Sequence, residues 1–276
     1  MNRTALDQYE GLVTDALKSC SAKLRKSFKT AFIQLMILYM VLPRKINFTQ
    51  MGRYSDSSEQ RFRQLFEREF DWMQFNLFLM RQRFGESVRK AIAIDASYIS
   101  KSGKKTPYIG KFWSGCASQV KRGLEILGIG IIDIDSRDCM MLRAEQTPDK
   151  TYLEKQGEDY NLVDWYLDVL RKHKDRLLRI TRYVVADAWF SKAKFVGEAC
   201  LLGFHVISRL RDDVALWYAH DGVRTGKRGR PRIKGEKIDF ENLDLQRCEV
   251  LDIEGGRAYS VKAYSKAMKR NIKVVV

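Results

Sequence analysis

The stretch RYVVADAWFSK, residues 182–192, decides the fold of this chain. Residues 183–186 form a short apolar run that is typical of a buried strand, and the chain then presents Asp187. A carboxylate at the end of such a strand is costly unless a positive group meets it. A helix predicted over residues 191–203 and a strand predicted over residues 204–210 follow. The order strand, helix, strand is typical of an α/β layer.

A second aspartate stands in a matching context. Asp95 ends the run AIAID, and like Asp187 it follows apolar residues and precedes an alanine. We therefore expect both acids at strand ends. Alternating and apolar patterns predict further strands over residues 91–99, 124–135 and 140–147, and an amphipathic helix over residues 161–179. These elements predict a mixed sheet flanked by helices.

The paired aspartates point to a metal site. Two carboxylates side by side repel each other unless a cation neutralises them. Oxygen ligands without a nearby His or Cys favour Mg²⁺ or Mn²⁺, and two such ions about 3.5–4 Å apart can drive phosphoryl transfer. The alternative is that each Asp only caps a turn. The matched contexts favour the metal site, so we predict Asp95 and Asp187 on adjacent strands, sharing a cation.

The composition favours an anionic partner. The chain has 276 residues and a net charge of +16, which favours nucleic acid over a membrane surface or a basic surface without a partner. Its five cysteines are widely separated and form no CxxC pair, which argues against a zinc site and for a cytoplasmic location. The most apolar run, residues 31–43, is too short to span a bilayer. The N-terminus has no signal-peptide pattern.

Two basic segments are candidate DNA contacts. The first, between Ala96 and Leu124, has no acidic residue and interleaves cations with aromatics, although a plain surface loop is the alternative. Its Phe112 and Trp113 are expected in the core rather than against bases. The predicted DNA-binding residues of both segments are Lys101, Lys104, Lys105, Lys111, Arg224, Lys227, Arg228, Arg230 and Arg232.

The second basic segment is KRGRPRIKG, residues 227–235. Its Arg-Gly-Arg-Pro core resembles an AT-hook, whose extended backbone would enter a narrow A·T minor groove. We favour the alternative of a basic hairpin tip that contacts only phosphates. Trp217, which lies in the same part of the chain, is expected in the core rather than stacked on a displaced base.

Four regions are predicted along the chain. Residues 1–88 are helical and include a helix-turn-helix outline, with Ser57 or Ser58 capping a helix whose buried stripe is Phe62, Leu65, Phe66 and Phe70. An ordinary helical pair with a solvated Arg-rich face is an equal alternative to a DNA-binding domain. The other regions are an α/β core over residues 89–210, a β-rich insertion over residues 211–262, and a return to the core over residues 263–276.

Two stretches carry a family resemblance: residues 91–135, from AIAIDASYIS to IIDID, and VVADAWFSK, residues 184–192. They resemble the catalytic core of DDE-class insertion-sequence transposases, in which a β-rich insertion splits a ribonuclease-H-like fold. The resemblance covers roughly residues 90–276. It implies Asp95 and Asp187 as the first two ligands of Mg²⁺ or Mn²⁺. It further implies double-stranded DNA, at transposon ends and target, as the partner, a homodimer on that DNA as one arrangement, and a place at the bacterial nucleoid.

The sequence departs from that family at the third ligand. The family has a Glu on a helix after the insertion, in the pattern Tyr-x2-Arg-x3-Glu-x6-Lys, and no acidic residue follows Glu254 here. We therefore expect a chain that stops before its last catalytic element, binds Mg²⁺ weakly and does not cut DNA at a useful rate. The rival functions are a DNA-binding transposase remnant without catalysis and a cellular ribonuclease-H-like nuclease, which would lack the β-rich insertion. Since no Walker-type loop is present, ATP use is not expected.

Overall fold

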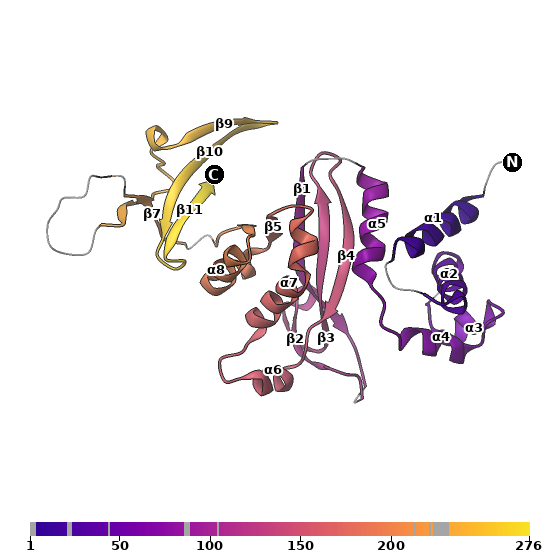
Figure 1. The fold of residues 1–276 in the computed structure, drawn as a ribbon. Helices are drawn as coiled ribbons and strands as arrows, with labels where there is room; N and C mark the ends of the chain where they lie inside the picture. The colour runs from indigo at the N-terminus through magenta and orange to yellow at the C-terminus, as the bar shows by residue number, and fades with distance from the viewer. Residues whose placement is uncertain are drawn as a thin grey trace. The chain divides into compact units, whose positions relative to one another are not determined.

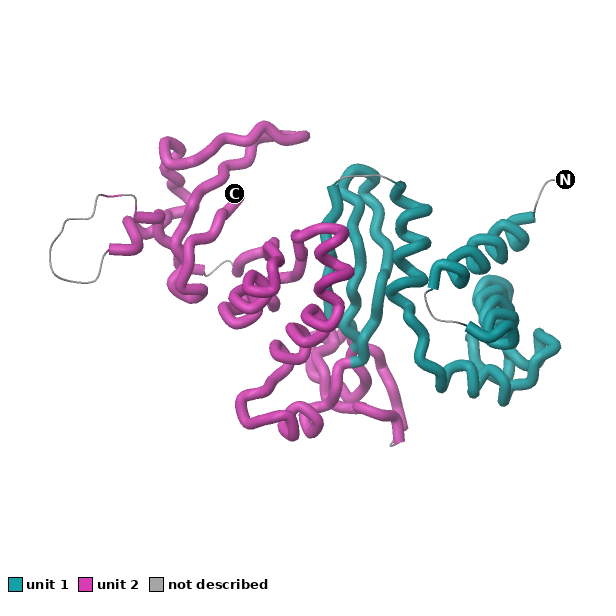
Figure 2. Tube along the Cα trace, viewed as in Figure 1, with its two compact units in different colours: residues 1–97, 126–146 teal, residues 98–125, 147–276 magenta. Residues whose placement is uncertain are grey.

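The protein has a mixed α/β fold with two sheets (Figure 1). The computed structural model describes residues 4–20, 24–43, 45–85, 89–103, 105–211, 214–220, 222 and 232–276. The chain forms two compact units, residues 1–97 with 126–146 and residues 98–125 with 147–276 (Figure 2). The division passes through strands β1 (Lys90–Ser100) and β3 (Gln119–Asp133), so each unit contains part of both.

The N-terminal part of the first unit is helical, as predicted. Its helices are α1 (Ala5–Ser19), α2 (Lys26–Val41), α3 (Phe48–Arg53), α4 (Glu59–Phe66) and α5 (Trp72–Phe84). Leu17, Phe32 and Phe75 are buried where these helices pack together, because their apolar residues recur at helical spacing. None of the described helices has both the length and the apolar character that crossing a bilayer requires.

The predicted pair of helices around Gly52 is present. Ser58 caps α4, since its side chain accepts a hydrogen bond from the Arg61 backbone N–H. A Cβ on Gly52 would lie 2.9 Å from the Glu59 backbone nitrogen, so α3 can approach α4 this closely only with a glycine there. The prediction for Phe66 is wrong. It is 52% exposed and its ring contacts Phe48 edge-on, because it lies in the last turn of a short helix.

Helix α5 packs against β4 (Asp138–Gln146), which joins the helical region to the strands of the first unit. The Asn76 side chain donates a hydrogen bond of 2.9 Å to the Leu142 carbonyl. Arg83 forms an ion pair of 2.7 Å with Asp138. The first unit thus includes both the predicted helical region and part of the strands predicted in the α/β core.

The first sheet has the strand order β2-β3-β1-β5-β6, with β4 paired to β3. The strands not yet introduced are β2 (Gly110–Ser114), β5 (Tyr183–Ala186) and β6 (His205–Ser208). Strand β3 pairs antiparallel with β4 from Ile126↔Gln146 to Asp133↔Asp138, and their turn is residues 134–137. The strands predicted over residues 124–135 and 140–147 are therefore confirmed, with ends shifted by a few residues.

Strand β1 overturns one expectation about Asp95. The strand continues to Ser100, so Asp95 lies inside it and not at its end. The main-chain carbonyl of Asp95 lies beside β3, where a Cβ on Gly128 would be 3.7 Å from that oxygen. A strand continues as long as its backbone groups find hydrogen-bond partners, whether or not its side chains are apolar. The end of the apolar run before Asp95 therefore did not mark the end of β1.

The strand, helix, strand order expected around Asp187 is confirmed in the second unit. Strand β5 pairs in parallel with β6, from Tyr183↔His205 to Ala186↔Ser208, and α8 (Ala193–Leu201) connects them. The unit also contains α6 (Lys150–Gln156) and α7 (Leu162–Leu178), which is the predicted amphipathic helix. Its apolar face is buried, as periodicity predicts. Tyr183 itself is exposed, unlike the other apolar residues of β5.

The second sheet has the order β11-β10-β7-β8, with β9 paired to β10. Its strands are β7 (Leu216–Ala219), β8 (Lys234–Lys237), β9 (Glu249–Ile253), β10 (Gly256–Ser265) and β11 (Arg270–Val275). The expected return to the core sheet over residues 263–276 is not observed, because β11 pairs antiparallel with β10 from Ser260↔Val275 to Ser265↔Arg270. A short turn over residues 266–269 makes this local hairpin the nearest pairing available.

Gly123 provides a test of the packing in the second unit. A Cβ at this position would overlap the Ile99 carbonyl oxygen and the ring of Tyr98. A Gly123→Ala variant should therefore lose about 1–3 kcal/mol of unfolding free energy in urea denaturation, since the backbone of β1 would have to shift. The matched control is Gly115→Ala, where the described structure has no atom within 4 Å of the added methyl. Equal stability of the two variants would contradict this account of the close approach.

Candidate active site and nucleic-acid interface

Asp187 follows β5 directly and opens a short 3₁₀ helix, Ala188–Phe190. Its Oδ1 accepts a hydrogen bond of 3.0 Å from the Trp189 backbone N–H. Its main-chain carbonyl accepts one of 2.8 Å from the Ser208 hydroxyl at the end of β6. The carboxylate is exposed, and Oδ2 takes part in no hydrogen bond among the described residues. The turn-capping role is therefore real but occupies only one of the two carboxylate oxygens.

The turn after Asp187 is supported by an aromatic cluster in the second unit. Phe190 is 2% exposed, and its ring centroid lies 5.4 Å from that of Tyr166 on α7 and 5.0 Å from that of Phe195 on α8. Trp189 meets the same Tyr166 ring edge-on at 5.5 Å. Because these rings are packed on two helices, the backbone that carries Asp187 has little freedom to move.

A buried carboxylate anchors this cluster. Glu125 on β3 is only 7% exposed, and its Oε1 accepts a hydrogen bond of 2.6 Å from the Tyr166 hydroxyl. A buried acid needs such a partner, since an unpaired polar group in the interior costs about 1–3 kcal/mol. The contact ties α7 to β3 and thereby fixes the ring on which Trp189 and Phe190 rest.

Lys192 places a positive charge against this turn. Its ammonium nitrogen lies 3.3 Å from the centroid of the Trp189 ring, in a cation–π contact. Burial of the ammonium lowers the pKa of Lys192 below its ordinary value, and the negative charge of Asp187 offsets part of that effect. Lys192 is therefore a neighbouring positive charge of Asp187, while the divalent cation predicted as its partner stays a prediction.

Asp95 presents a second exposed carboxylate, in the first unit. It follows the buried Ile94 on β1, and its side chain has no hydrogen-bond or ion-pair partner in the described part of the chain. The described residues contain no group of three or more His, Cys, Asp and Glu side chains that could hold a metal ion. Mg²⁺ is often bound through only one or two carboxylates, with waters and substrate phosphates completing the shell. Each aspartate by itself offers an exposed carboxylate of the kind that Mg²⁺ accepts, and their convergence on one ion stays a prediction.

The predicted DNA-binding residues fall into three groups. Lys101, Lys105 and Lys111 are exposed, the first two after β1 and the third on β2. Arg232 is exposed and donates a hydrogen bond of 3.0 Å to the Lys234 carbonyl. The other predicted contacts lie outside the described residues: Lys104, Arg224, Lys227, Arg228 and Arg230.

The aromatic predictions are partly wrong. Phe112 on β2 is buried as expected, but its neighbour Trp113 is 60% exposed. Successive residues of a strand point to opposite faces, and of these two only the side chain of Phe112 lies on a covered face of β2. Trp217 is half-buried rather than in the core, and the Lys234 ammonium lies 4.3 Å from its ring centroid.

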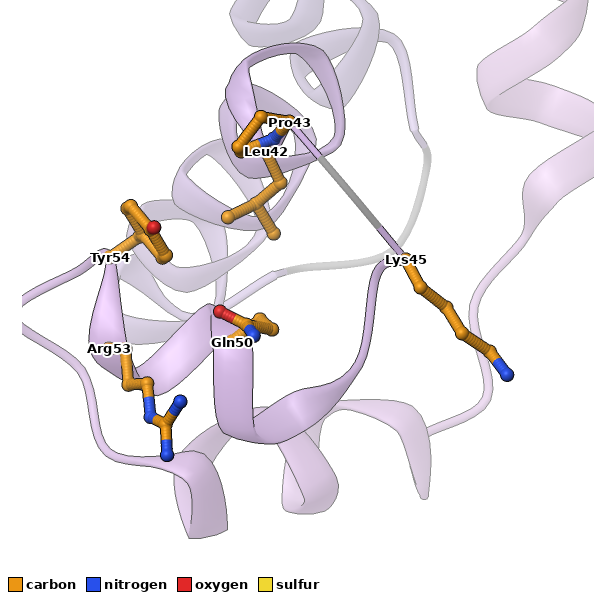
Figure 3. A pocket seen from close by; sticks show the side chains of 6 residues that line it. All are labelled: Leu42, Pro43, Lys45, Gln50, Arg53 and Tyr54. Carbon is orange, nitrogen blue, oxygen red and sulfur yellow. The ribbon is translucent and has the colours of Figure 1, made fainter.

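The helical pair α3–α4 presents the other predicted basic surface. Of its exposed arginines, Arg61 donates a hydrogen bond to the Ser27 carbonyl and keeps its charge, whereas Arg63 forms an ion pair with Glu59 that offsets its charge. A cavity of about 580 Å³ lies between α2 and α3. In Figure 3 the Lys45 side chain points away from this cavity. The cavity is lined by Leu42, Pro43, Lys45, Gln50, Arg53 and Tyr54. Both interpretations of this helical pair stay predictions.

Sequence reasoning missed the residues that hold the site. Glu125 carried a usable signal, because it falls on the buried phase of β3 together with Leu127 and Ile129. Ser208 carried none, since its contact with Asp187 depends on the parallel pairing of β5 with β6.

Comparison with known proteins relates most of the chain to one protein family. A family model described as DDE superfamily endonuclease matches residues 25–267, a range that contains Asp95 and Asp187. The crystal structure of the Mos1 mariner paired end complex with Mn is similar over 75% of this chain and 69% of that chain, at 12% sequence identity. Its TM-score of 0.20 is too low to carry an argument about the fold. No curated protein sequence matches the chain.

Proposed function

Because the chain belongs to the family of DDE superfamily endonucleases, we propose that it is a DNA transposase. Its reaction would be metal-dependent cleavage of DNA strands at the ends of an insertion sequence, followed by strand transfer to target DNA. The observation that carries this proposal is the family match, which spans most of the chain and includes both exposed aspartates.

Asp95 and Asp187 are the residues that would hold Mg²⁺ or Mn²⁺. When bound, such an ion supplies Lewis-acid polarisation of the phosphodiester and lowers the pKa of bound water. Asp187 suits a ligand role because Oδ1 is fixed by the Trp189 N–H while Oδ2 is unengaged among the described residues. Asp95 suits it because its carboxylate is exposed and likewise unengaged there. The Ser208 hydroxyl and the Phe190 ring would keep the Asp187 backbone in position.

DNA is the partner that the charge distribution supports. The net charge is +16, and Lys101, Lys105 and Lys111 lie exposed in a segment without acidic residues. Such cations contact phosphates and release condensed counterions, which makes binding salt-dependent. A rival proposal is a DNA-binding protein without catalysis. Nicking of a supercoiled plasmid in Mn²⁺, abolished by EDTA, would support the transposase, whereas duplex binding without nicking would support the rival.

The three described lysines provide a test of the DNA contact. Replacing Lys101, Lys105 and Lys111 with Ala should make the slope of log affinity against log salt shallower by about 0.9 for each phosphate that is no longer neutralised. Fluorescence anisotropy with a labelled duplex, measured over a range of salt concentrations, gives this slope. Lys155→Ala is the control, since this exposed lysine on α6 lies outside both basic segments. An unchanged slope in the triple variant would remove these lysines from the DNA interface.

A further inference from the structure

The hairpin of β2 and the first residues of β3 presents an unusual exposed face. The two strands pair antiparallel with Lys111 opposite Arg122 and Trp113 opposite Val120. Residues two apart on a strand share a face, and directly paired residues share it too, so these four side chains lie together. Trp113 is 60% exposed and Val120 is 57% exposed, while Lys111 and Arg122 are exposed beside them.

Two features of this face are unfavourable without a ligand. Like charges directly opposite in a ladder destabilise the pairing, and Lys111 and Arg122 are such a pair. An indole beside an exposed valine places a large apolar surface in water. An anion between the cations and a flat apolar group on the indole would relieve both at once.

Arg122 is held in place for such a contact. Its guanidinium Nη2 donates a hydrogen bond of 3.0 Å to the Gly103 carbonyl, and its own main-chain carbonyl accepts one of 2.7 Å from the Tyr98 hydroxyl. The contact holds the main chain at Gly103 close to the Arg122 guanidinium.

We propose that this face binds an unpaired segment of DNA, with a base stacked on Trp113 and the adjacent phosphate between Lys111 and Arg122. In a duplex the flat faces of the bases are covered by their neighbours, so only an unpaired base can offer one to an indole that stands out from a strand. The positive charges select a nucleic-acid strand over an apolar peptide. This inference rests on the proposed DNA function and names the form of DNA that the hairpin takes.

The test compares a labelled 20-nucleotide oligothymidylate with a duplex of the same length by fluorescence anisotropy. Trp113→Ala should weaken single-strand binding about tenfold and change duplex binding less than twofold, because only the single strand can stack a base on the indole. Trp113→Phe, which keeps a ring, should recover most of the affinity. Tyr183→Ala is the control, since Tyr183 is similarly exposed but lies on β5.

A second variant tests the charge pair independently. Lys111→Glu places an acid opposite Arg122, so it should raise the melting temperature of the free protein and weaken single-strand binding. Equal losses on single-strand and duplex DNA with Trp113→Ala, or no loss at all, would overturn the inference while the wild-type protein still bound DNA. If the wild-type protein bound neither form of DNA, the proposed function itself would fail.

Discussion

An Asp187→Asn variant is expected to lose the metal-dependent DNA cleavage of the proposed transposase by about 10³-fold, which corresponds to about 4 kcal/mol of transition-state stabilisation. A chain that cuts DNA as slowly as the sequence alone predicts would instead show no measurable loss. The amide keeps the size of the side chain and an oxygen that can accept the Trp189 N–H, so the turn should be preserved. What the substitution removes is the negative charge that a divalent cation requires. The same substitution at Asp95 should have an effect of the same order.

Mn²⁺ binding gives a readout that does not depend on turnover. Titration followed by electron paramagnetic resonance should show at least about a tenfold weaker Mn²⁺ affinity for each Asp→Asn variant. The matched control is Asp252→Asn, an exposed acid of the second sheet with an ion-pair partner in Arg257, which should bind Mn²⁺ as the wild type does. If both Asp95→Asn and Asp187→Asn bound Mn²⁺ with unchanged affinity, the assignment of the two ligands would be wrong.

Much of the fold was predictable because its elements are local. The β5–α8–β6 order follows from an apolar run, a helical period ending near Gly203, and another apolar run. The α/β class is confirmed by the structure, and the family predicted from the contexts of Asp95 and Asp187 is confirmed by the match over residues 25–267. Local sequence patterns were enough to predict these helices and strands, because each of them has the hydrophobic period of its own type of secondary structure.

The sequence-based predictions were wrong where strand pairing or side-chain packing determines the position of a residue. The apolar run before Asp95 did not show that β1 continues to Ser100, because pairing with β3 sets the length of that strand. Trp113 was expected in the core on hydrophobicity alone, although strand alternation with Phe112 directs it outward. The sequence predicts that residues 263–276 return to the core, whereas β11 pairs with β10 in the second sheet because a short turn joins these two strands. In each case the pairing of strands, and not the hydrophobicity of one stretch, decides where the residues lie.

The turn that carries Asp187 is held by Phe190, which packs against rings from α7 and α8. Removing this ring is the substitution for which we expect the largest loss of stability. Phe190→Ala should lower the free energy of unfolding by about 3–5 kcal/mol, because it leaves a cavity among rings from α7 and α8. Urea denaturation monitored by circular dichroism measures this loss. The substitution should also weaken metal binding, because Phe190 ends the short 3₁₀ helix that begins after Asp187 and so helps to position that carboxylate. At temperatures where the variant is folded, its Mn²⁺ affinity should still fall.

Phe190→Leu separates packing from an aromatic requirement. A leucine retains most of the buried volume, so this variant should lose well under half of the stability that the alanine costs, with Mn²⁺ affinity close to that of the wild type. Tyr183→Ala removes an exposed ring from the same region and should cost little. If Phe190→Ala unfolded at the same urea concentration as the wild type, the cluster would not be packed as described. If it were destabilised but bound Mn²⁺ normally when folded, the cluster would support the fold without positioning Asp187.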